Sequence, residues 1–174
     1  MATPTAAAAV PTPQPTPTVH FAHVAGVETD KTIIPDPKFS AWPHINLKEA
    51  QRLQKARGVV FADMRAKVEW DQSHIPGAIC VPQGEFDAYY SKSEKKFKKA
   101  RIIVVYCHGV GCHLSDLGCQ HFHDKGYKNV VNFYGGWPDW SGAKLPIQDG
   151  QGKLIVSTPV PAPAMSPTPT PQAK

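Results

Sequence analysis

Four short apolar runs stand out along the middle of the chain. They occupy residues 59–62, 78–81, 102–106 and 130–133, and each is bounded by polar, proline or glycine residues. Continuous apolar runs of this length are typical of parallel strands that are buried on both faces. We therefore expect four strands of a mainly parallel sheet.

Segments with helical spacing of apolar residues separate some of these runs. Before the first run, Asn46 is a good N-cap with Glu49 three residues later, and apolar residues follow at helical spacing up to Gly58. Another helical pattern begins near Ser115. Strands that alternate with helices indicate an α/β layer structure, in which ligands bind at the carboxyl ends of the parallel strands.

The third apolar run ends at Cys107, at the carboxyl end of a predicted strand. A loop with glycines at 109 and 111 follows, and both glycines permit positive φ angles. Backbone N–H groups, the dipole of the following helix and the flanking His108 and His113 would lower the pKa of this thiol and make it reactive. The alternative is a buried structural cysteine at a strand end.

Several further motifs surround this loop in a defined order. They are Phe61-Ala62-Asp63-Met64-Arg65, Glu69-Trp70, His74-Ile75-Pro76-Gly77-Ala78-Ile79, Gly126-Tyr127, Asn129-Val130 and Tyr134-Gly135-Gly136 with Trp140. Together with the cysteine loop they resemble the rhodanese family over residues 41–147. The resemblance implies a rhodanese-like three-layer α/β fold with a mainly parallel central sheet flanked by helices.

The resemblance also implies a function. Rhodaneses are sulfurtransferases, so Cys107 is expected to take a sulfane sulfur from thiosulfate or a similar anionic donor, to become a persulfide, and to pass the sulfur to cyanide or a thiol. No cofactor or metal is implied. The loop expected to bind the substrate and the persulfide comprises His108, Gly109, Val110, Gly111, Cys112 and His113, and the supporting residues are Asp63, Arg65 and His74.

The cysteine loop departs from the short form common in single-domain members of that family. It has the longer pattern C-x-G-x-x-C-x-x-S, lacks the arginine of the shorter loop, and adds a second thiol, Cys112. Either His113 or backbone N–H groups would have to replace the arginine. Cys112 could be a resolving thiol, which leaves open a non-catalytic persulfide carrier or redox-sensing module that uses Cys107 and Cys112.

Other interpretations concern single residues. Asp63 is expected to have a structural role, whereas Arg65 could either be structural or orient a donor. Cys80 and Cys119 are expected to be buried and inert. A metal site of cysteines and histidines has poor spacing for zinc. Phosphatase chemistry of the C-x5-R type is disfavoured because His113 stands where that pattern has arginine.

Composition sets the domain limits. Both ends of the 174-residue chain are rich in Pro, Thr and Ala, so we expect disordered tails at 1–20 and 151–174, an N-terminal extension at 21–40, and one rhodanese-like domain at 41–150. The net charge of +5 has much of its excess at 92–101, which indicates a solvated basic segment rather than a nucleic-acid site.

Partners and compartment are less constrained by the sequence. No apolar stretch approaches the roughly 20 residues needed to cross a bilayer, so no membrane span is expected. We expect a monomer that binds neither nucleic acid nor membrane. The compartment stays open between the periplasm, as a mature form that lacks its signal, and the cytoplasm.

Overall fold

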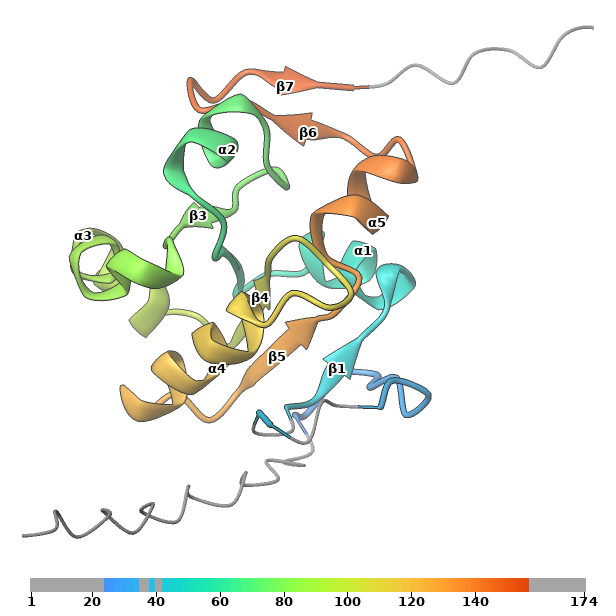
Figure 1. Ribbon diagram of the computed structural model, residues 1–174, viewed down its shortest axis with the longest axis vertical. Helices are drawn as coiled ribbons and strands as arrows, with labels where there is room; N and C mark the ends of the chain where they lie inside the picture. Colours follow the sequence, from blue (N-terminus) through green and yellow to red (C-terminus); the bar gives the residue numbers. More distant parts are fainter. Residues whose placement is uncertain (1–23, 35–37, 40–41, 157–174) are drawn as a thin grey trace, which may run out of the picture.

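The computed structural model describes residues 24–34, 38–39 and 42–156. Its elements alternate between strands and helices, as the hydrophobic pattern predicts (Figure 1). In chain order they are β1 (His44–Ile45), α1 (Leu47–Gln54), β2 (Val59–Asp63), α2 (Lys67–Gln72), β3 (Ile79–Cys80), the 3₁₀ helix η1 (Gln83–Glu85), α3 (Phe86–Lys98), β4 (Ile102–Tyr106), α4 (Leu114–Asp124), β5 (Val130–Phe133), α5 (Gly136–Gly142), β6 (Ile147–Gln148) and β7 (Leu154–Ile155).

The central sheet has five strands in the order β1-β5-β4-β2-β3, and all neighbouring strands run parallel. The most hydrophobic strand, β4, occupies the middle and is buried along its whole length. The predicted α/β fold with a mainly parallel sheet is thus confirmed. The central position of β4 places the residue after it, Cys107, over the middle of the sheet's carboxyl edge.

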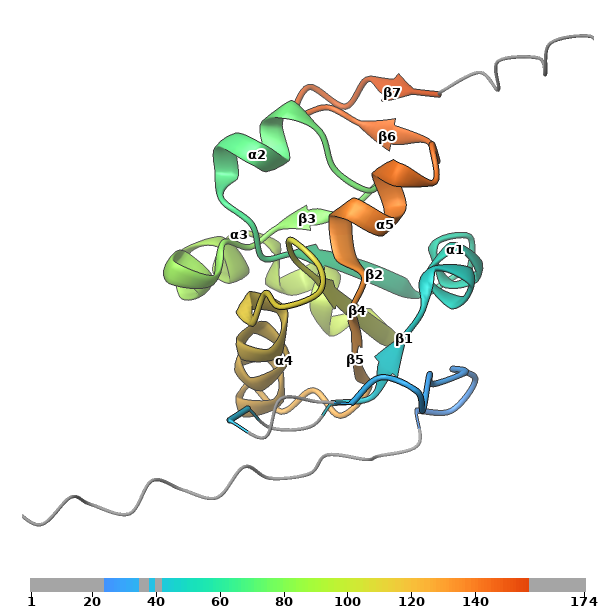
Figure 2. The ribbon, with the colours of Figure 1, turned by 45° about the vertical axis from the view of Figure 1, so that its right-hand side comes forward.

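Helices cover both faces of this sheet, as Figure 2 shows, with α1 and α5 on one side and α3 and α4 on the other. Two hydrophobic clusters correspond to the two faces. The first joins Leu53 of α1 and Trp140 of α5 to the sheet, and the second joins Phe97 of α3 and Phe122 of α4 to it.

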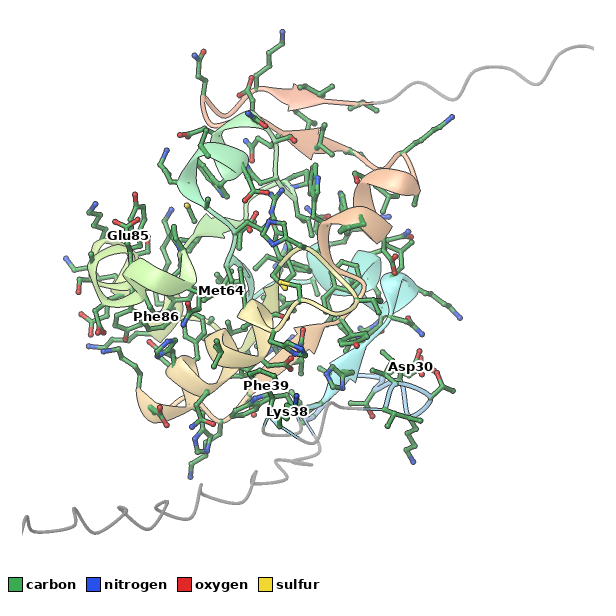
Figure 3. All side chains as sticks on the ribbon, viewed as in Figure 1. Asp30, Lys38, Phe39, Met64, Glu85 and Phe86 are labelled. Atoms are coloured by element: carbon green, nitrogen blue, oxygen red, sulfur yellow. The ribbon has the colours of Figure 1, made fainter. Side chains whose placement is uncertain are left out.

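Aromatic rings fix α4 against α3. Phe86, which Figure 3 labels at the start of α3, makes an edge contact with Phe122 of α4 at 5.0 Å between ring centroids. The rings of Phe97 and Phe122 lie 4.8 Å apart. Because α4 is anchored along this apolar side, its first turn is held at the carboxyl edge of the sheet, where the cysteine loop ends.

The chain after the sheet forms a short antiparallel hairpin of β6 and β7. Residues 151–156, which the composition assigns to the C-terminal tail, form the second half of this hairpin. The remainder of that tail, and the predicted tail at 1–20, lie outside the described residues. Of the predicted N-terminal extension, Val24 and Val27 are buried in the core. None of the helices in the described ranges is both long enough and apolar enough to cross a membrane.

Candidate active site

The cysteine loop connects β4 to α4 above the middle of the sheet. Cys107 follows β4 directly and is only 1% exposed. The loop turns through a hydrogen bond from the backbone N–H of Cys112 to the carbonyl oxygen of Gly109, 2.9 Å long. Gly109 and Gly111 have φ angles of +95° and +81°, which confirms the prediction that both positions need positive φ.

A second glycine pair, Gly135 and Gly136, holds the loop from the side. Gly136 has a φ of +57°, and a Cβ atom there would lie 2.5 Å from the carbonyl oxygen of Cys107 and 2.7 Å from the nitrogen of Gly109. The backbone N–H of Trp137 then donates to the Cys107 carbonyl at 2.9 Å. The start of α5 therefore packs directly against the backbone of the cysteine loop.

The sulfur of Cys107 lies in a closed environment. Its Sγ is 3.4 Å from the carbonyl oxygen of Cys112 and 3.3 Å from the hydroxyl of Ser115. In this conformation a hydrogen bond with the Cys112 side chain raises the pKa of Cys107 and burial adds to the effect, which opposes the predicted ionisation of this thiol. Ser115 and the backbone N–H of Gly109 favour the thiolate but do not reverse the shift.

Cys112 carries the opposite shift. The hydrogen bond from Cys107 lowers the pKa of Cys112 to about 5, with further help from the backbone N–H of Leu114 and from the ring and backbone N–H of His108. Cys112 is half-buried, whereas Cys107 is buried. Of the two neighbouring thiols, the more accessible one is thus the one that ionises first.

His108 connects Cys112 to a carboxylate from another part of the chain. Its Nδ1 lies 3.6 Å from Sγ of Cys112, and its Nε2 lies 2.8 Å and 3.0 Å from the two carboxylate oxygens of Glu69 on α2. Partial burial opposes protonation, but the hydrogen bonds to Cys112 and Glu69 prevail and raise the pKa of His108. The sequence assigned no role to Glu69, since 39 residues separate it from His108.

The second loop histidine faces elsewhere. His113 stacks on Phe39, labelled in Figure 3, with ring centroids 4.1 Å apart. Its Nδ1 lies 3.5 Å from Oδ2 of Asp116 on α4. These contacts direct the ring of His113 towards α4 and the N-terminal segment. His108, by contrast, points its Nδ1 at the thiol of Cys112.

Asp63 and Arg65 form a buried ion pair beneath the site. Arg65 is 2% exposed, and its Nη2 donates to Oδ2 of Asp63 at 2.6 Å. The guanidinium also lies 4.6 Å from the ring centroid of Trp137, and the hydroxyl of Tyr106 donates to Asp63 at 2.6 Å. This network fixes the ends of β2 and β4 and leaves Arg65 no exposed face with which to orient a donor.

His74 supports the C-terminal end of α2. It is 2% exposed and stacks on Trp70 with ring centroids 3.9 Å apart, and its Nδ1 lies 2.8 Å from the Trp70 carbonyl oxygen. Its backbone pairs with Gln148 of β6 as an isolated antiparallel bridge. His74 therefore joins the helix that carries Glu69 to the terminal hairpin.

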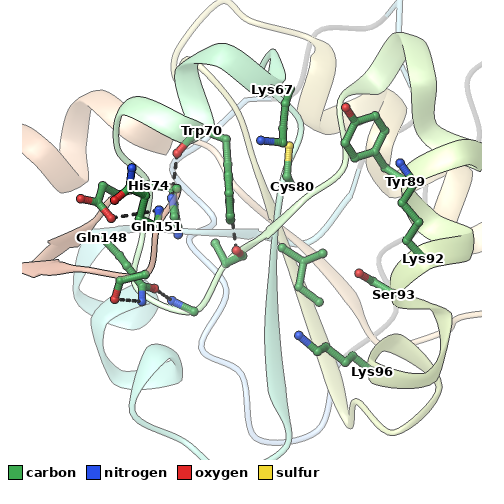
Figure 4. Close-up of a pocket in the computed structure, with 16 residues that line it drawn as sticks. Lys67, Trp70, His74, Cys80, Tyr89, Lys92, Ser93, Lys96, Gln148 and Gln151 are labelled. Carbon is green, nitrogen blue, oxygen red and sulfur yellow. Dashed lines mark hydrogen bonds between the residues drawn. The ribbon is translucent and has the colours of Figure 1, made fainter.

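A cavity of about 480 Å³ lies beyond His74, between α2, α3 and the hairpin (Figure 4). Lysines 67, 92 and 96 and the thiol of Cys80 are among its lining residues, and the cysteine loop is not. Burial raises the pKa of Cys80 to about 12. The cavity thus contains a protonated thiol, in agreement with the expectation that Cys80 is inert, and it is separate from Cys107 and Cys112.

The candidate metal ligands are dispersed. Among the described residues, no three His, Cys, Asp or Glu side chains are grouped so as to hold a metal ion. Cys119 is fully buried in α4, and burial raises its pKa well above the ordinary value.

Comparisons with known proteins agree with this geometry. The Rhodanese-like domain family matches residues 46–143, a span that contains β2 to β5 and the cysteine loop. The chain belongs to this family. The solution structure of the Rhodanese-like domain from Anabaena sp Alr3790 protein shares the fold, with a TM-score of 0.51 and 19% identity over 76% of this chain and 94% of that one.

Two related sequences carry functional names. Thiosulfate sulfurtransferase GlpE of Coxiella burnetii is 30% identical over 109 residues, which are 62% of this rhodanese-like chain and 94% of the relative. The Putative sulfur carrier protein YrkF of Bacillus subtilis is 27% identical over 104 residues, which are 59% of this chain and about half, 53%, of that protein. Sulfur transfer is therefore supported at the level of the family.

Proposed function

We propose that this rhodanese-like protein is a sulfurtransferase that carries a sulfane sulfur as a persulfide on Cys107. In the first half-reaction, the Cys107 thiolate attacks the outer sulfur of thiosulfate or a similar donor. The S–S bond of the donor breaks, and sulfite leaves with its electron pair. In the second, cyanide or a thiol takes the outer sulfur, and the Cys107 thiolate is regenerated.

The position of Cys107 is the observation that carries this proposal. The thiol follows the central strand directly and lies at the start of a loop that has two glycines at positive φ and closes through a tight turn between Gly109 and Cys112. Its proton can pass to Cys112 and from there to His108, since Cys107 hydrogen-bonds with Cys112 and Nδ1 of His108 lies 3.6 Å from Sγ of Cys112. The names of the relatives point to the same chemistry.

A second candidate function is a persulfide carrier or redox-sensing module that uses Cys107 and Cys112. Both cysteines are free thiols, and Sγ of Cys107 lies 3.4 Å from the carbonyl oxygen of Cys112. A relative that is named as a putative sulfur carrier supports this alternative. It differs from the first function because the sulfur would load onto the protein without catalytic turnover.

Thiocyanate formation from thiosulfate and cyanide separates the two functions. We expect the wild-type protein to turn over repeatedly, Cys107→Ser to lose activity, and Cys80→Ala to keep it as a matched control for loss of a thiol. Ping-pong kinetics are expected for a covalent intermediate. Loading of one sulfur without turnover would favour the carrier, and activity that survives in Cys107→Ser but not in Cys112→Ser would refute the role of Cys107.

A further inference from the structure

Glu69, His108 and Cys112 form a chain of hydrogen-bonding groups beside Cys107. The carboxylate lies 2.8 Å from Nε2 of the imidazole, and the other ring nitrogen lies 3.6 Å from the sulfur of Cys112. A nucleophile, a base and a third group that orients the base are the parts that activate a thiol in enzymes. The persulfide chemistry proposed for Cys107 does not by itself require this second activated sulfur.

The elements that hold the three groups are independently anchored. Glu69 also accepts a hydrogen bond from the backbone N–H of Ala66 at 3.2 Å, which fixes its side chain in the first turn of α2. His108 and Cys112 are placed by the turn that closes between Gly109 and Cys112. The arrangement therefore follows from the backbone of two separate segments that meet above the sheet.

We propose that Cys112 is a second sulfur site, which takes the sulfane sulfur from the persulfide of Cys107 and presents it to acceptors at the surface. The inference rests on the sulfurtransferase function proposed above. The side chains of His108 and Glu69 are 46% and 35% exposed and Cys112 is half-buried, whereas Cys107 is enclosed. An acceptor thiol on a larger molecule reaches Cys112 more easily than it reaches Cys107.

The transfer step balances without an external oxidant or reductant. The thiolate of Cys112 attacks the outer sulfur of the Cys107 persulfide, and a new S–S bond forms on Cys112. The S–S bond of Cys107 breaks with its electron pair on the Cys107 sulfur, which receives the proton of the outer sulfur. The products are a persulfide anion on Cys112 and a thiol on Cys107. His108, oriented by Glu69, holds the attacking thiolate and then the persulfide anion.

Tandem mass spectrometry of the loaded protein tests the relay. The full chain is treated with thiosulfate, freed of excess donor, alkylated and cut with trypsin. Cys107, Cys112 and Cys119 all fall in the peptide 102–125. Backbone cleavage at 109–111 separates Cys107 from Cys112, and cleavage at 114–118 separates Cys112 from Cys119, so the fragments assign the extra sulfur to one cysteine. We expect it on Cys112 in the wild type and on neither residue in Cys107→Ser.

Two carboxylate variants on α2 test the role of Glu69. Glu69→Gln can keep the hydrogen bond from Ala66 but loses the charge that faces His108, so the share of sulfur on Cys112 should fall several-fold. Asp71→Asn is the matched control, because Asp71 pairs with Lys67 on the same helix and should leave the distribution unchanged.

Each other outcome counts against the relay. Sulfur on Cys107 alone, together with thiocyanate formation, overturns the relay and leaves the proposed function intact. A disulfide between Cys107 and Cys112 shows a resolving thiol instead. Extra sulfur on Cys112 in Cys107→Ser shows direct loading by the donor. Failure of every variant and of the wild type to take up sulfur overturns the proposed function and the relay together.

Discussion

Acidification should distinguish Cys112 from an ordinary thiol. The hydrogen bond from Cys107 lowers the pKa of Cys112 to about 5, so this sulfur stays mostly ionised in mildly acidic solution. An unperturbed cysteine with a pKa of about 8.5 is almost entirely protonated there. Since the thiolate is the form that reacts with alkylating agents, the rate of alkylation as a function of pH reports this difference.

The size of the effect follows from the fraction of thiolate. Between pH 7.5 and 5.5, the ionised fraction of a group with a pKa of about 5 falls only from nearly all to about three-quarters. For a group with a pKa of about 8.5, it falls from about 9% to about 0.1%, nearly a hundredfold decrease. The comparison is made within one residue, so the intrinsic nucleophilicity of the thiolate cancels.

Iodoacetamide is a suitable probe because it is neutral at both pH values. Alkylation of Cys112 is followed by peptide mass spectrometry, and the buried Cys119 serves as an unreactive internal reference. We expect the rate at Cys112 to fall by less than about twofold, and to fall more steeply in His108→Gln. A decrease near a hundredfold in the wild type would refute the assignment of the thiolate to Cys112.

Three further predictions concern the supports of the site. Tyr106→Phe removes a donor to the buried carboxylate of Asp63 and should lower the free energy of unfolding by about 1.5–3 kcal/mol in urea titrations. Gly136→Ala should lower the free energy of unfolding by about 1–2 kcal/mol because of the positive φ alone. It should also displace the cysteine loop, so that thiocyanate formation falls. Gly142→Ala lies on the same helix, where a Cβ meets nothing within 4 Å, and should retain activity. Burial lowers the pKa of His74, so the neutral imidazole is favoured in the folded protein. The resulting contribution to the free energy of unfolding is present above about pH 6.5 and is lost as the pH falls towards the pKa of His74 in the folded protein. The urea midpoint should therefore drop less between about pH 7 and 5 in His74→Gln than in the wild type. Equal drops in the two proteins, or an inactive Gly142→Ala, would contradict these assignments.

The positions of β2, β3, β4 and β5 could be predicted from the sequence because each of these strands lies in a continuous apolar run, whereas the two-residue strands β1, β6 and β7 were not predicted. The runs 102–106 and 130–133 coincide with β4 and β5, whereas β2 continues one residue further, to Asp63. A charged residue normally ends such a run, but here Arg65 and Tyr106 satisfy the carboxylate within the core. Those partners depend on tertiary packing, so local hydrophobicity could not include Asp63 in the strand.

Local signals also located the start of α1 but not its end. Asn46 accepts a hydrogen bond from the backbone N–H of Glu49, as the capping pattern predicts, and the helix begins at Leu47. It ends at Gln54 rather than continuing to Gly58. A capping residue acts on the first turn alone, whereas the end of this helix depends on how the chain enters β2.

The candidate site combined predictable and unpredictable parts. The position of Cys107 after a buried strand followed from the hydrophobic pattern of the sequence. The ionisation of the two thiols did not, because it depends on which sulfur is enclosed and on the hydrogen bonds that Cys107 and His108 make with Cys112. The contact between His108 and Glu69 on α2 did not either. Contacts between segments far apart in the chain give no periodic pattern that a single sequence can reveal.

The charge near the thiols restricts the donor. Residues 107–113 contain no lysine or arginine, and Arg65 is paired with Asp63. One negative charge remains when the ionised forms of Glu69, His108 and Cys112 are added together, whereas the whole chain has a net charge of +5. At 0.1 M salt the Debye length is about 10 Å, so the local charge should govern the approach of a dianion such as thiosulfate. Loading of Cys107 by thiosulfate should then accelerate with added salt, and a rate that falls with salt would show that the distant lysines attract the donor instead.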